Sequence, residues 1–129
     1  MPKKTKTLIV EDNANFRQTI KEILISKFPF MSINQAADGR EALLKLANQQ
    51  IDLIFMDIQL PEKSGLILTK KIRKAYPHAI IIILTHHDLP EYREAAYKNG
   101  AQYFLSKETT NTSEIAELVE SILDGVERI

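Results

Sequence analysis

The sequence lacks cysteine, and it lacks an excess of charge of either sign. Without cysteine there can be no disulfide, no thiolate nucleophile and no zinc–thiolate site. Lysine plus arginine and aspartate plus glutamate both number 17, so the formal net charge is zero. A chain with this balance is not expected to coat nucleic acid or an anionic membrane through bulk charge.

The sequence also lacks an apolar run long enough to cross a membrane. The longest run, Ala79–Leu84, is far shorter than the roughly 20 residues that a spanning helix needs. The basic N-terminus leads into an apolar stretch that is too short for a signal peptide. We therefore expect a soluble cytoplasmic protein, and the length suits a single domain over residues 1–129.

Short apolar runs alternate with segments of helical apolar spacing along the chain. Strands are predicted at Leu8–Val10, Ser32–Ala36, Ile51–Met56, Ile80–Ile83 and Tyr103–Leu105. Helices are predicted from the apolar spacing within Phe16–Phe28, Ala42–Ala47, Leu68–Ile72 and Ile115–Val126, and between Asp88 and Gly100. Asp38, Ser64 and Asp88 are placed to cap helices, and Asn99-Gly100 predicts a helix end.

This alternation predicts an α/β fold with three layers. Strands that read as continuous apolar runs, separated by helices, form parallel sheets that are covered on both faces. We expect a doubly wound (βα)5 domain of flavodoxin-like type, with a parallel five-stranded sheet in the order 2-1-3-4-5. In such sheets the ligand lies beyond the carboxyl ends of the strands, where the strand order reverses.

Polar side chains follow four of the five predicted strands, at the edge where a ligand is expected. They are Glu11, Asp12, Asp57, Thr85 and Lys107. Taken singly, each is explained as a cap, an ordinary strand residue or a surface charge. Because the first and third strands are neighbours in the expected order, Glu11 and Asp12 should lie beside Asp57.

Three clustered carboxylates repel one another and need a counter-charge. A hard divalent cation with oxygen ligands fits, Mg²⁺ in the first place and Mn²⁺ as an alternative. Phosphoryl transfer combines such a cation with carboxylates, a lysine and a threonine hydroxyl, which neutralise the phosphoryl oxygens. An aspartate can itself be the nucleophile and form an aspartyl phosphate.

With Pro61 and Gly65 after Asp57, this set resembles the receiver domain of two-component response regulators, and the resemblance covers essentially the whole chain. It implies that Asp57 accepts a phosphoryl group from a phosphohistidine on a sensor histidine kinase or phosphotransfer protein. The transfer would be self-catalysed and followed by slow autodephosphorylation. The protein would thus be a phosphorelay signalling switch and not a conventional enzyme.

The resemblance implies roles for the neighbouring residues as well. Asp12 and Asp57 would bind Mg²⁺ by their side chains, with the backbone carbonyl of Gln59 as a further ligand. Glu11 would contribute mainly through water. Lys107 would pair with Asp57 before phosphorylation and with the phosphoryl group afterwards.

Thr85 and Phe104 would form the switch. Thr85 would swing toward the phosphoryl oxygen, and the Phe104 ring would turn inward as it does. The surface formed by the fourth strand and helix and the fifth strand and helix would then change and engage a partner. Homodimerisation that depends on phosphorylation is one expected outcome.

The sequence departs from the family pattern after Lys107, and two of its residues stand at positions that vary within the family. Many family members have proline after the conserved lysine, often with a cis bond, but here Glu108 follows Lys107, and a cis bond would be costly. Gln59 and His87 occupy the positions that tune phosphoryl hydrolysis in the family. Their identities do not by themselves fix the lifetime of the phosphoaspartate.

The same residues bear on three rival functions. A phosphatase of the haloacid dehalogenase type would need a second aspartate where Gln59 stands. A flavodoxin-like cofactor module would need a phosphate-binding loop where Glu11, Asp12 and Asn13 place negative charge. A degenerate receiver that serves only as an interaction module is opposed by the presence of all five key side chains, and it stays open.

The segment Glu117–Gly125, and the lack of proline after Lys107, resemble regulators with a C-terminal helix-turn-helix DNA-binding domain. We expect a receiver from such a transcription factor, with a free-standing receiver as the alternative. The 129 residues themselves contain no DNA-reading element, so no direct nucleic-acid contact is expected from them.

Other conspicuous side chains are predicted to have ordinary surface or packing roles. The basic cluster within Lys70–Lys74 is typical of a solvated helix face. His86 and His87 are adjacent on a strand and would point to opposite faces, which disfavours a metal site. Tyr92 and Tyr97 are expected to be packing or surface residues.

Overall fold

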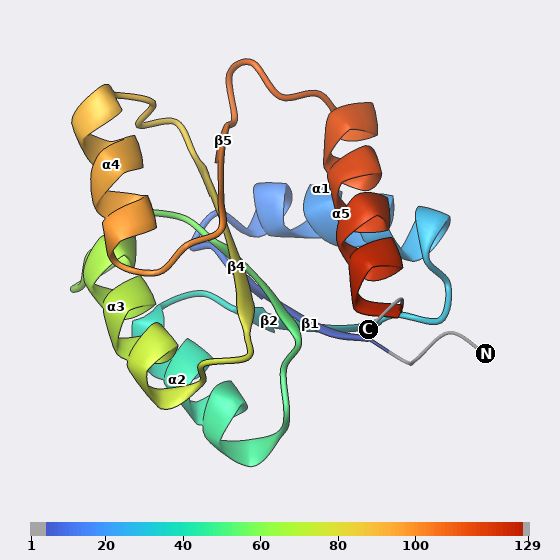
Figure 1. Cartoon of the computed structure of the whole chain (residues 1–129), viewed down its shortest axis with the longest axis horizontal. Coiled ribbons are helices and arrows are strands. Elements are labelled where there is room, and N and C mark those ends of the chain that lie inside the picture. Colours follow the sequence, from blue (N-terminus) through green and yellow to red (C-terminus); the bar gives the residue numbers. More distant parts are fainter. Residues whose placement is uncertain (1–4, 128–129) are drawn as a thin grey trace.

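The computed structural model describes residues 5–127, in which strands and helices alternate without exception (Figure 1). This confirms the predicted succession of five strands and five helices. Among these residues no helix is both long and apolar enough to span a bilayer. The elements are β1 (Lys6–Val10), α1 (Ala14–Lys27), β2 (Ser32–Ala36), α2 (Gly39–Asn48), β3 (Leu53–Met56), α3 (Gly65–Ala75), β4 (Ile80–Thr85), α4 (Pro90–Lys98), β5 (Tyr103–Ser106) and α5 (Thr112–Glu127).

The strands form one parallel sheet in the order β2-β1-β3-β4-β5, which confirms the predicted doubly wound fold. Helices α1 and α5 cover one face of the sheet, and α2, α3 and α4 cover the other (Figure 1). The strand order reverses between β1 and β3. The carboxyl ends of these two strands therefore meet where ligands bind in folds of this kind.

Alternate side chains of the central strands enter two separate apolar layers. Leu8, Ile54 and Ile81 pack on the side of α2, α3 and α4. Ile9 and Phe55 pack on the side of α1 and α5. Since both faces of β3 and β4 are covered, apolar side chains are needed at every position, and the sequence shows unbroken apolar runs there.

Three predicted caps can be compared with the structure, and one is wrong. The side chains of Asp38 and Ser64 cap α2 and α3 as predicted. Asp88 does not cap α4, because Leu89 is the N-cap residue and makes no side-chain capping bond. The Asp88 carboxylate instead pairs with Arg93, one turn into the helix, at 2.9 Å.

Smaller differences concern the ends of elements. The third strand begins at Leu53, two residues later than predicted, although Ile51 ahead of it is buried. The fourth strand runs on to Thr85. The predicted end of α4 is confirmed, with Gly100 at a φ of 114° just after the C-cap residue. The side chain of Val126, the last of the predicted apolar stripe, lies outside the described residues.

The basic face of α3 is only partly the solvated surface that was predicted. Lys70, Lys71 and Lys74 are exposed. The guanidinium of Arg73, however, donates through Nε and Nη2 to the carbonyl oxygen of Gly100, at 3.0 and 2.9 Å. Arg73 therefore ties α3 to the turn after α4.

A tight turn after β3 presses the start of α3 against the end of that strand. The N–H of Gly65 donates to the carbonyl oxygen of Ile58 at 2.6 Å. A Cβ at residue 65 would lie 1.9 Å from the backbone oxygen of Asp57, which no side-chain rearrangement could relieve. Gly65 thus permits a close approach that sets the backbone around Asp57.

We predict that Gly65→Ala lowers the free energy of unfolding by about 1–3 kcal/mol, the usual cost of forcing additional atoms into a packed site. Urea titration measures this change. Gly125→Ala is the matched control, because a Cβ there meets nothing within 4 Å. Equal stability of the two variants would contradict the close approach.

Candidate functional site

The register of the sheet brings the predicted strand-end residues together. Val10 and Met56, the last residues of β1 and β3, are paired neighbours. Glu11 and Asp57 therefore leave the sheet side by side. The N–H of Asp57 also donates to the carbonyl oxygen of Val10 at 3.1 Å, which extends the pairing by one residue.

The ammonium group of Lys107 lies between two carboxylates. Its Nζ donates to Asp57 Oδ2 at 3.1 Å and to Glu11 Oε1. The pairing with Asp57 is the expected one, while the bond to Glu11 is new. The side chains of Lys107 and Glu11 are each 4% exposed and that of Asp57 is 9% exposed, so water contributes little to their solvation.

A backbone hydrogen bond helps to hold Lys107 between the two carboxylates. The Lys107 N–H donates to the carbonyl oxygen of Thr85 at 2.9 Å, which links the loop after β5 to the end of β4. The peptide between Lys107 and Glu108 is trans, because the described residues contain no cis bond. The conformation that the sequence left open is thereby established for this structure.

Glu11, Asp12 and Asp57 form an acidic cluster. One carboxylate oxygen from each lies within 4.8 Å of the others, with Glu11 and Asp57 buried and Asp12 exposed. Burial raises the pKa of Glu11; hydrogen bonds from Lys107 and the Asn13 N–H oppose this, and the charge of Asp57 adds to it. A donor set made only of oxygen atoms suits a hard cation such as Mg²⁺.

A cleft of about 550 Å³ opens beside this cluster. It has room for a hydrated cation, since each water occupies roughly 30 Å³. Three of the four residues predicted for the metal site, Asp12, Asp57 and Gln59, line it, whereas Glu11 does not. The N–H of Gln59 donates to Asp57 Oδ1 at 3.4 Å. The full lining is Asp12, Asn13, Phe16, Asp57, Gln59, Leu60, Pro61, His86 and Lys107.

The two predicted switch residues are both buried, Thr85 as the last residue of β4 and Phe104 as the second residue of β5. Thr85 Oγ1 accepts the N–H of His87 at 3.2 Å. Phe104 is 4% exposed, so its side chain already faces inward in this structure, whereas the family resemblance implied an inward turn on phosphorylation. Arg93 lies over that ring, with its Cζ 4.7 Å from the centroid, a contact that the sequence did not reveal.

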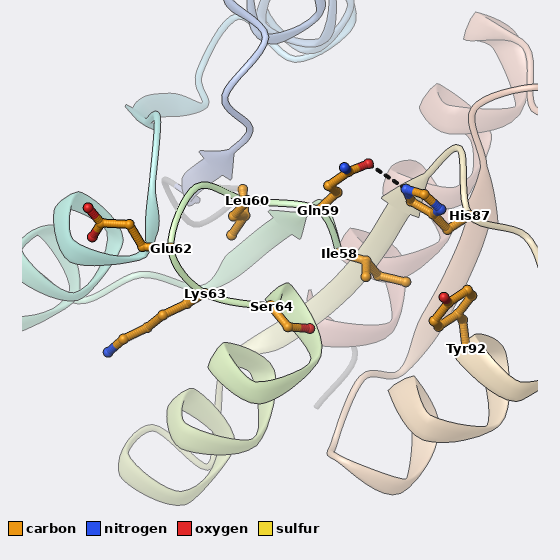
Figure 2. Close-up of a pocket in the computed structure, with 8 residues that line it drawn as sticks. All are labelled: Ile58, Gln59, Leu60, Glu62, Lys63, Ser64, His87 and Tyr92. Carbon is orange, nitrogen blue, oxygen red and sulfur yellow. Dashed lines mark hydrogen bonds between the residues drawn. The ribbon is translucent and has the colours of Figure 1, made fainter.

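The adjacent histidines have different partners, but they lie in the loop after β4 and not on a strand as predicted, because β4 ends at Thr85. His87 Nε2 lies 2.6 Å from Gln59 Oε1, and its ring meets the edge of Tyr92 at 5.9 Å between centroids. Figure 2 shows Gln59 and His87 pointing toward one another across the rim of a second cleft. His86 Nδ1 lies 2.7 Å from Glu108 Oε1.

Two more residues of the site are missed by sequence reasoning. Asn13 caps α1 by accepting the N–H of Phe16 at 2.9 Å, and its own N–H donates to Glu11 Oε2 at 3.1 Å. The Phe16 ring lies 4.2 Å from Lys107 Nζ. In the sequence Phe16 is conspicuous only as the first apolar residue of a helix.

The sheet order, the acidic cluster and the buried lysine at the carboxyl edge of the sheet together identify a doubly wound α/β domain with a charged site at its switch point. The family model described as the response regulator receiver domain matches residues 7–120. The chain belongs to this family.

Relatives and solved structures agree with this assignment. The oxygen regulatory protein NreC of Staphylococcus carnosus is 37% identical over 103 residues, which are 79% of this chain and 48% of that protein. The transcriptional regulatory protein DegU of Brevibacillus brevis is 29% identical over 122 residues, which are 95% of this chain and 51% of that protein. The chain therefore spans about half the length of these curated relatives.

Two solved structures extend the likeness over nearly the whole chain. A two-component response regulator from Clostridium difficile has a TM-score of 0.87 and 30% identity, and covers 94% of this chain and 97% of its own. A CheY-like receiver domain protein from Methanospirillum hungatei has a TM-score of 0.89 and 27% identity, with 98% of both chains covered.

We predict that Mg²⁺ raises the free energy of unfolding in a saturable manner, because a cation that binds only the folded cluster stabilises the fold by mass action. The gain is about 2.7 kcal/mol at a hundredfold excess over Kd. Asp12→Asn should lose most of this gain, whereas Asp124→Asn, at an exposed position on α5, should keep it. Equal Mg²⁺ responses in the two variants, measured by thermal unfolding, would contradict the assignment.

Proposed function

We propose that this domain is a phosphorylation-dependent switch that accepts a phosphoryl group on Asp57. One observation carries the proposal: the Asp57 carboxylate lies beside an open cleft, held by the Lys107 ammonium and flanked by two further carboxylates. Membership of the receiver family supports it. The donor would be a phosphohistidine on a cytoplasmic sensor histidine kinase domain or phosphotransfer protein.

In the transfer an oxygen of the Asp57 carboxylate forms a bond to phosphorus as the phosphorus–nitrogen bond of the donor breaks. The electron pair of the broken bond leaves with the imidazole nitrogen, which then takes a proton from water. Lys107 would stay paired with the negative charge as it moves onto the phosphoryl oxygens, and the Thr85 hydroxyl would donate to one of them. The domain would thus promote its own modification and slowly hydrolyse the product, unlike a conventional enzyme.

Asp12 and Asp57 would hold Mg²⁺, or Mn²⁺, by their carboxylates, together with the backbone carbonyl of Gln59. The two oxygens of Glu11 accept bonds from Lys107 and from a backbone N–H, so Glu11 would contribute through water. Bound there, the cation supplies positive charge that neutralises phosphoryl oxygens.

The output would arise on the surface of α4, β5 and α5. Thr85 would move toward the phosphoryl oxygen and exchange its bond to the His87 N–H, and the Phe104–Arg93 stack would repack in response. The changed surface would engage a second copy of the domain or an output domain. Phosphorylation can shift this equilibrium only by stabilising one conformation more than the other.

Relatives of about twice this length are named as oxygen and transcriptional regulators. We therefore propose that the regulated process is transcription, through a helix-turn-helix DNA-binding domain that is not among these residues. The receiver itself would make no direct contact with nucleic acid.

We predict that a small-molecule phosphodonor with Mg²⁺ adds one phosphoryl group to the native protein, and that hydroxylamine removes it. Mass spectrometry follows the adduct, and Asp57→Asn should abolish it because the nucleophile is gone. Asp124→Asn, an exposed acid on α5, is the control and should be labelled fully. If the native protein took up no phosphoryl group, the domain would be a plain interaction module. If Asp57→Asn took up as much as the native protein, another residue would be the acceptor, and the proposed switch at Asp57 would be contradicted.

A further inference from the structure

The Lys107 ammonium has three N–H groups, and the carboxylates account for only two of them. One donates to Asp57 and one to Glu11. The ring of Phe16 lies over the same nitrogen, 4.2 Å from the ring centroid. An aromatic face attracts a cation most strongly where water is scarce, and the Lys107 side chain is only 4% exposed.

The Phe16 ring is held in place by the start of α1. The backbone N–H of Phe16 donates to the capping side chain of Asn13, and the backbone N–H of Asn13 donates to the second carboxylate oxygen of Glu11. Glu11, Asn13, Phe16 and Lys107 thus form a closed circuit of contacts. The ring also packs against the apolar layer below α1 and α5 and lines the cleft.

We propose that Phe16 is a positioning residue for the phosphorylation of Asp57, with its ring holding the Lys107 ammonium between Asp57 and Glu11 and shielding it from water. This inference rests on the function proposed above. A lysine side chain has four flexible carbons, so two hydrogen bonds alone leave it several ways to meet the carboxylates. The ring removes the arrangements in which the ammonium turns toward the cleft and binds water.

The rival explanation is that Phe16 is only an apolar packing residue. In that case a side chain of similar volume without a ring would serve equally well. Phe16→Leu keeps the apolar packing and removes the aromatic face, and Phe16→Tyr keeps the face. The half-buried ring at the cleft wall leaves the tyrosine hydroxyl a route to water. Phe16→Met replaces the leucine variant if the latter does not fold.

The test combines kinetics with a direct probe of the contact. The rate of acyl phosphate formation is measured with a small-molecule phosphodonor and Mg²⁺, and the Lys107 ε-methylene resonances are recorded by NMR without donor. We expect Phe16→Leu to slow phosphorylation about three- to tenfold, the rate equivalent of one cation–π contact. It should also abolish the upfield ring-current shift of the Lys107 resonances.

The tyrosine variant should retain both the rate, within about twofold, and the upfield shift. Phe30→Leu is the matched control, because Phe30 is an exposed ring that contacts Phe28 and is remote from Lys107. A native-like rate in Phe16→Leu, equal losses in the leucine and tyrosine variants, or unshifted Lys107 resonances in the native protein would overturn the inference. Absence of any phosphoryl uptake by the native protein would overturn the proposed function, and with it the role of Phe16 in that reaction.

Discussion

The contact between the Lys107 ammonium and the carboxylates of Glu11 and Asp57 is the interaction on which the site depends. Removing one partner from a buried ion pair costs about 3–5 kcal/mol, because the remaining charge is left without water or counter-charge. Two buried carboxylates beside the exposed Asp12 would repel one another without Lys107. The β1–β3 register, the Gly65 turn and the backbone bond to Thr85 all act to keep this contact in place.

The fold was largely predictable because its signals are local. The apolar runs of β3 and β4 must be apolar on both faces in a covered parallel sheet, so their burial is evident from the sequence. The strand-end positions of Glu11, Asp57 and Lys107 follow from the same reasoning, since a parallel sheet delivers every strand's carboxyl end to one edge. Residue type and topology were sufficient to predict the acidic cluster.

The remaining features depend on tertiary geometry that no local pattern contains. Asp88 has the right residue type for a helix cap, but the nearby Arg93 offers it an ion pair instead. From the sequence, Arg73 is expected to be a solvated cation on the helix surface, but the fold brings the carbonyl oxygen of Gly100 within hydrogen-bonding distance of it. Phe16 has the same helical spacing as its apolar neighbours, so the sequence predicts only a packing role. Its contact with the Lys107 ammonium is seen only in the folded structure.

The central claim is that Lys107 makes a buried Asp57 tolerable, and a double-mutant cycle on the free energy of unfolding tests it most directly. The cycle compares Lys107→Met, Asp57→Asn and the double variant in urea titrations. We predict that Lys107→Met lowers the free energy of unfolding. Asp57→Asn should be less destabilising, or more stabilising, in the Lys107→Met background than in the native protein, with a coupling of about 1–3 kcal/mol. Effects that add within about 0.5 kcal/mol would contradict the account.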